Sequence, residues 1–161
     1  MIGARAHQSA GAIDQLCWSR AHQRGVDLLE AAGCEEGVNT SRYRQARLAR
    51  AQGDSPHALA LAVQSLRGYR VLGHRRDVPS CLDLIDGLIV HAQPAAAAKL
   101  FAAAGALRAS MAVRLPPADR ASHEAGVAAA RAALGESGYS DACALGAART
   151  HEARHTRAAH T

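Results

Sequence analysis

The chain has few aromatic residues, so large rings cannot dominate its core. Its 161 residues include one Phe, one Trp and three Tyr. Much of the 48% hydrophobic content is Ala instead, which favours helix but buries little area per residue. We therefore expect closely packed helices with small residues at their contacts, rather than a large, deep core.

Long apolar runs and strand patterns are also missing. No stretch approaches the roughly 18 uninterrupted apolar residues that a membrane span needs, and residues 1–25 are too polar for a secretion signal. Alternating runs of β-branched and aromatic residues, which are typical of strands, do not occur. The sequence predicts an all-α protein, located in the cytoplasm and without a membrane partner.

Lysine is almost absent, although the chain is basic. Lys99 is the only lysine, and it follows four alanines with no glycine nearby, which excludes a P-loop. The net charge of +5 therefore comes from arginine, and it favours anionic partners without selecting one. The four cysteines form no C-x-x-C pair that would indicate a zinc finger.

Helical periodicity is present along nearly the whole chain. The clearest example is VPSCLDLIDGLIVHA, residues 78–92, where apolar residues recur at three- and four-residue steps. Glycine and proline interrupt the periodicity elsewhere, as at Gly53, Pro94 and Gly135. The pattern predicts helices at about 12–32, 38–52, 55–72, 77–92, 94–112, 117–134 and 137–148.

An internal repeat with a period near 40 residues relates these helices. It aligns Gly33 with Gly73 and Ala58 with Ala97, and each unit is a helix, a tight turn and a second helix. One such hairpin cannot bury its apolar face alone. We expect a single domain over residues 1–148, an α-solenoid of stacked hairpins with repeats at about 36–72, 76–112 and 117–148, followed by a polar His- and Arg-rich tail over 149–161.

Two segments resemble known helical repeats. AQGDSPHA, residues 51–58, is similar to the turn inside a tetratricopeptide repeat, with Ala58 at the small-residue position. Residues 81–146 resemble the C-terminal helical-repeat region of actinobacterial LuxR-type and signalling-ATPase transcriptional regulators, most clearly in segments 98–108, 115–120 and 132–136. The resemblance covers about residues 28–148.

This resemblance implies a tetratricopeptide-like fold and a cytoplasmic, non-catalytic scaffold that binds a partner protein. The nucleotide-hydrolysing and DNA-binding parts of such regulators have no counterpart in the sequence. A standalone relative, an excised region and a gene remnant stay open as alternatives. Arg44 and Gln45 depart from the family pattern, which places small or apolar contacts there.

A partner-binding groove is predicted from the repeat register. Tyr43, Arg47 and Arg50 share one helix face at i, i+4 and i+7. The next repeat places Leu82, Asp86 and Ile89 at the matching positions. Such a face could bind an acidic peptide or a terminal carboxylate through the guanidinium groups. The alternative interpretation is that this charged helix face is simply solvated and that Leu82 and Ile89 lie in the core.

Two other functions come from different classes. The first is nucleic-acid binding, since arginines cluster at residues 42–50 and 70–76, although few aromatics accompany them. The second is a zinc peptidase, because His151, Glu152 and His155 match H-E-x-x-H. That match lacks a downstream third ligand, as positions 158 and 161 are Ala and Thr. We therefore predict a protein with no catalytic residue, metal or cofactor.

Overall fold

The described part of the chain is helical throughout. The structure is a computed structural model; it describes residue 21 and residues 23–158, with side chains to residue 148. Residues 23–31 are helical, followed by α2 (Glu35–Ala51), α3 (Ser55–Val71), α4 (Val78–Ile89), α5 (Pro94–Met111) and α6 (Pro117–Ala158). The all-α prediction is confirmed, and no helix within these ranges is long and apolar enough to cross a membrane.

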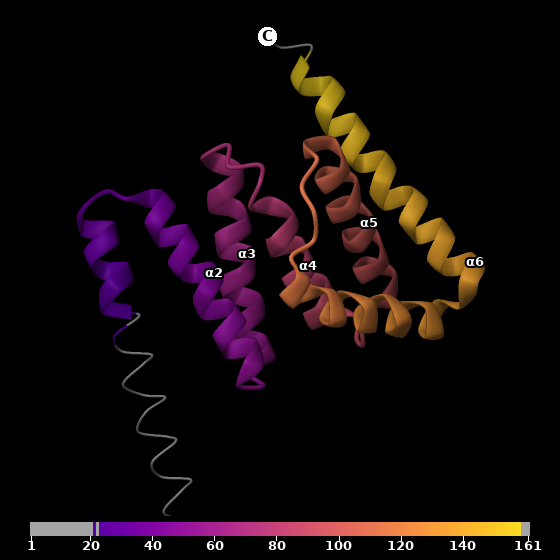
Figure 1. Ribbon diagram of the computed structural model, residues 1–161, viewed down its shortest axis with the longest axis horizontal. Coiled ribbons are helices and arrows are strands. Elements are labelled where there is room, and N and C mark those ends of the chain that lie inside the picture. The colour runs from indigo at the N-terminus through magenta and orange to yellow at the C-terminus, as the bar shows by residue number, and fades with distance from the viewer. Residues whose placement is uncertain (1–20, 22, 159–161) are drawn as a thin grey trace, which may run out of the picture.

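Consecutive helices pack side by side. Helix α2 packs on α3, α3 on α4, α4 on α5, and α5 on α6, so the chain advances from one side of the molecule to the other (Figure 1). One core cluster joins Ala46 and Ala62 to Leu84 and Ile85. A second surrounds Phe101 on α5. Alanine at the contacts allows this close packing, as the composition predicts.

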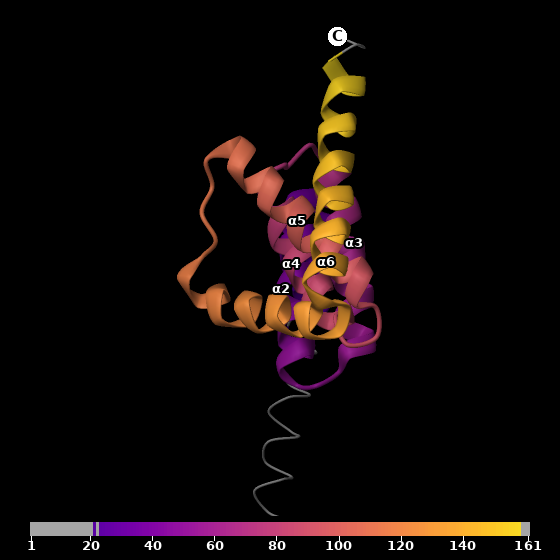
Figure 2. The ribbon, with the colours of Figure 1, turned by 90° about the vertical axis from the view of Figure 1, so that its right-hand side faces the viewer.

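Helix α6 has two halves. Gly135 has a φ of 70° and a ψ of 168°, which breaks the helix at the predicted position. The first half runs across the direction of α4 and α5, and the second half turns back along α5 (Figures 1 and 2). The second half continues to Ala158 rather than ending at residue 148, since no Gly or Pro interrupts the Ala- and Arg-rich sequence after residue 146.

Left-handed residues end the helices at related positions. Gly33, Gly53 and Gly73 have positive φ. In each case the backbone N–H groups of the glycine and of the next residue donate hydrogen bonds to carbonyl oxygens of the preceding turn, as in a Schellman motif. Ala112 ends α5 in the same way with a φ of 53°. Ala58 and Ala97, which the repeat alignment pairs, are both fully buried.

Ala112 gives a first prediction. Because a Cβ is strained at positive φ, Ala112→Gly is expected to raise the free energy of unfolding by about 0.5–1 kcal/mol. Ala109→Gly, three residues earlier in the helical part of α5, is the control and should lower it by up to about 1 kcal/mol. Urea unfolding followed by circular dichroism measures both. Equal destabilisation by the two substitutions would contradict the strain at residue 112.

Candidate functional site

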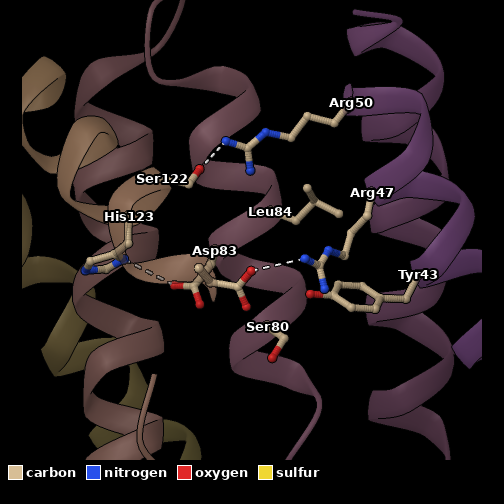
Figure 3. A pocket seen from close by; sticks show the side chains of 9 residues that line it. Tyr43, Arg47, Arg50, Ser80, Asp83, Leu84, Ser122 and His123 are labelled. Atoms are coloured by element: carbon tan, nitrogen blue, oxygen red, sulfur yellow. Dashed lines mark hydrogen bonds and ion pairs between the residues drawn. The ribbon is translucent and has the colours of Figure 1, made fainter. Parts of the chain in front are cut away.

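A small polar cavity lies between α2, α4 and the first half of α6. Helix α2 contributes Tyr43, Arg47 and Arg50, which were predicted to share a face. The remaining lining residues are Ser80, Asp83 and Leu84 from α4, with Asp119, Ser122 and His123 from α6 (Figure 3). Its volume is about 40 Å³, which is roughly the space for a few water molecules or one carboxylate group.

The two arginines of α2 reach across the cavity to α6. Arg47 Nη2 lies 3.3 Å from Asp119 Oδ1, and Arg50 donates a hydrogen bond from Nη2 to Ser122 Oγ (Figure 3). The Arg47 side chain is 52% exposed. The Arg50 guanidinium lies over Gly87, where a Cβ would be 3.3 Å from Nη2. The missing side chain at residue 87 therefore makes room for Arg50 against α4.

Arg108 forms a buried ion pair behind this cavity. Its guanidinium on α5 pairs with Asp83 on α4, and the side chains are only 9% and 13% exposed. Arg108 also donates a 3.5 Å hydrogen bond to the Pro79 carbonyl oxygen. Asp83 Oδ1 lies 3.6 Å from His123 Nδ1. The cluster links α4, α5 and α6, and it neutralises Asp83 with a permanent cation.

The His123 imidazole is mostly uncharged at neutral pH, because its pKa is lowered. Burial lowers the pKa of the imidazole, and the Arg108 charge lowers it further, while Glu124 opposes them. The ring packs edge-on against Phe101, with centroids 5.2 Å apart. Tyr43 keeps its phenolic proton, because burial raises its pKa although Arg47 opposes this. The cavity is therefore lined by two serine hydroxyls, a tyrosine hydroxyl and a neutral imidazole, in addition to its charged groups.

Asp86 is a fully buried carboxyl group. Its exposed fraction is 0%, and neither Oδ atom has a hydrogen-bond partner within the described residues. Burial raises the pKa of Asp86 to about 8, against the opposing effects of the nearby Gly87 backbone and the Arg50 charge. At neutral pH this group is therefore largely protonated, and it leaves the Arg50 charge without a carboxylate partner.

The Asp86 pKa predicts a pH dependence of stability. The folded-state pKa is raised, so the stabilising contribution is complete below the unfolded pKa near 3.8 and declines as pH rises to about 8. Wild type should thus lose up to about 1.4 kcal/mol per pH unit relative to Asp86→Asn within that window. Urea unfolding of both proteins at pH 5 and pH 8 tests this. A difference between them that does not change with pH would contradict it.

The structure separates the six predicted groove residues. Tyr43, Arg47 and Arg50 line the cavity, whereas Leu82, Asp86 and Ile89 do not. Leu82 and Asp86 are buried, and Ile89 packs against both core clusters. Ser80, Asp83 and Leu84 take their place on α4. The predicted α4 positions lie 39 residues after those of α2, whereas Gly73 lies 40 residues after Gly33. One residue corresponds to a rotation of about 100° around a helix, and a shift of 40 pairs Tyr43 with Asp83, which lines the cavity.

The remaining α6 residues of the cavity were not predicted. Asp119, Ser122 and His123 lie at i, i+3 and i+4, so they share a helix face. This helical spacing was the sequence signal from which a shared polar face on α6 could have been predicted. His151 and His155 fall on the helical backbone of α6, but their side chains lie outside the described residues. Among the side chains that are described, no three His, Cys, Asp or Glu residues cluster to hold a metal.

Comparisons with protein-family models, with curated proteins and with solved structures found no match. The geometry of the α2–α4–α6 cavity is therefore the main guide to function.

Proposed function

We propose that the chain is a non-catalytic helical-repeat module that binds an acidic segment of a partner protein. The observation that carries the proposal is the pair of arginines from α2, Arg47 and Arg50, which extend over a polar cavity between three helices. Guanidinium groups bind carboxylates with directed hydrogen bonds. The Arg47–Asp119 pair is an internal example of that contact.

The repeat arrangement supports this function. We propose that α2–α3, α4–α5 and the two halves of α6 are the three units of a short tetratricopeptide-like solenoid. The spacing of Gly33, Gly73 and Ala112, all left-handed, supports the repeat, and the burial of Ala58 and Ala97 supports equivalent α2–α3 and α4–α5 hairpins. The third unit differs, because its first helix crosses α4 and α5 (Figures 1 and 2). The cavity then lies along the first helices of all three units, where solenoids commonly bind partners.

The resemblance to LuxR-type and signalling-ATPase regulators supports the same class of function. The segments that carry it, 98–108, 115–120 and 132–136, cover most of α5, the start of α6 and the Gly135 break. We infer that the chain works in the cytoplasm as a regulatory scaffold rather than as an enzyme. Genes beside its own that encode an ATPase or a DNA-binding domain would support this relation.

The proposal is tested by reversing the two charges. Arg47→Glu with Arg50→Glu is expected to abolish binding of a fluorescein-labelled peptide that carries four Glu among Gly and Ser, because repulsion replaces attraction. The charge-matched control is Arg75→Glu with Arg76→Glu, at exposed residues of the α3–α4 turn, which should bind within about twofold of wild type. Fluorescence anisotropy gives the affinities. Equal binding by both double mutants would refute the site.

Nucleic-acid binding is the second candidate, and an exposed basic patch favours it. Arg67, Arg70, Arg75 and Arg76 are all exposed at the end of α3 and the turn after it. Tyr69 beside them is buried, at 4% exposure, so it offers no ring for base stacking. Retention on a labelled DNA or RNA duplex at physiological salt, lost in Arg75→Glu with Arg76→Glu, would favour this function over peptide binding.

A further inference from the structure

The three arginines around the cavity are neutralised to different extents. Arg108 has Asp83, and Arg47 has Asp119. Arg50 forms no ion pair with any described residue; its hydrogen-bond partner is the neutral Ser122 hydroxyl. A guanidinium with a neutral partner keeps its full attraction for an anion. Arg50 is therefore the cation of this cluster that can take a carboxylate without displacing another.

The surroundings of Arg50 hold the guanidinium in place. Gly87 allows the group to lie flat against α4, and Ser122 fixes one nitrogen from the α6 side. Arg50 is also half-buried, whereas Arg47 is exposed. An ion pair at a half-buried, pre-positioned group is weakened less by water and salt than one at an exposed side chain.

We infer that this cavity takes a single carboxylate from an acidic side chain of a partner peptide, and that Arg50 rather than Arg47 is the residue that anchors it. The inference rests on the proposed function and specifies its partner. The volume of about 40 Å³ accommodates a carboxylate, and peptides with capped and free termini distinguish a Glu side chain from a chain terminus as its source. The Tyr43 and Ser80 hydroxyls line the same cavity as further donors.

Asp119 acts on the same site as an internal competitor. Its carboxylate holds Arg47 at 3.3 Å, and it also adds a negative charge to the cavity lining. Removing that charge frees Arg47 and lessens the repulsion of an incoming carboxylate. Asp119→Asn should therefore bind an acidic peptide more tightly than wild type, by roughly two- to fivefold, the factor expected for one partly exposed charge pair.

The test uses single substitutions of Arg47 and Arg50 that either remove or keep the positive charge, together with one set of capped peptides. The probe is an N-acetylated, C-amidated peptide with four Glu among Gly and Ser, labelled for anisotropy, and its Gln counterpart is the uncharged control. Arg50→Gln is expected to weaken Glu-peptide binding by about tenfold or more, because a charged hydrogen bond is lost. Arg47→Gln should stay within about threefold of wild type. Arg50→Lys restores the charge and should recover part of the affinity.

The outcomes separate this inference from the proposed function. If no Glu peptide binds wild type, the proposed function fails. If it binds but Arg47→Gln weakens it as much as Arg50→Gln, the function stands and the anchor is wrong. A Gln peptide with a free terminal carboxylate that binds as well as the Glu peptide would overturn the side-chain assignment. Matching circular dichroism and thermal unfolding of the variants establishes that each loss arises at the site rather than from unfolding.

Discussion

Asp83→Asn is expected to lower the free energy of unfolding by about 3–5 kcal/mol, because it leaves the buried Arg108 charge without its partner. The Arg108 side chain is 9% exposed, and its other described acceptor is a single carbonyl oxygen, that of Pro79 at 3.5 Å. An amide at residue 83 preserves the size of the side chain but not its charge. Urea unfolding monitored by circular dichroism gives the value.

Arg131 and Glu136 supply the matched control for that experiment. They form an ion pair of 3.7 Å with side chains 52% and 77% exposed, so water already screens the charges. Glu136→Gln should change the free energy of unfolding by less than about 1 kcal/mol. Similar losses for Asp83→Asn and Glu136→Gln would mean that burial does not distinguish the two pairs.

Gly146→Ala is expected to destabilise the packing of α5 against the second half of α6 by about 1–3 kcal/mol, the usual effect of overpacking. A Cβ at residue 146 would lie 2.2 Å from the Lys99 carbonyl oxygen and 2.8 Å from its carbonyl carbon. These are backbone atoms, so no side-chain rotation relieves the contact. The helices must separate instead.

Gly105 provides the opposite case in the same helix pair. It lies on α5, where a Cβ would meet no neighbouring heavy atom within 4 Å, and it is exposed. Gly105→Ala should therefore raise the free energy of unfolding by about 0.5–1 kcal/mol through helix propensity. Thermal and urea unfolding of both substitutions measure the contrast. A stabilising Gly146→Ala would contradict the close approach of the two backbones.

The all-α class and most helix boundaries were predictable because local signals determine them. Gly33, Gly53 and Gly73 end helices in a conformation that glycine adopts easily, and Pro94 begins α5 where a missing amide is tolerated. Gly135 divides α6 at the predicted residue. The crossing of the first half of α6 over its neighbours was not predicted, because it depends on contacts between helices rather than on the residues of one helix.

The site was predictable in part for the same reason. Tyr43, Arg47 and Arg50 share a face through helical spacing alone, and they line the cavity together. The partners across the cavity depend on how α4 is rotated, and an approximate repeat register cannot set that rotation. Asp86 illustrates the difficulty, since a carboxyl group on an apolar helix was expected in the groove but is fully buried.

The most direct measurement is a titration of the isotope-labelled protein with the capped Glu peptide, followed by amide chemical shifts. We expect the largest shifts around the cavity, at Tyr43, Arg50, Leu84 and Ser122, and we expect Arg50→Gln to suppress them. Shifts centred on the exposed basic patch of Arg67, Arg70, Arg75 and Arg76, or a cavity unchanged at saturating peptide, would contradict the assignment of the α2–α4–α6 cavity as a carboxylate-binding site.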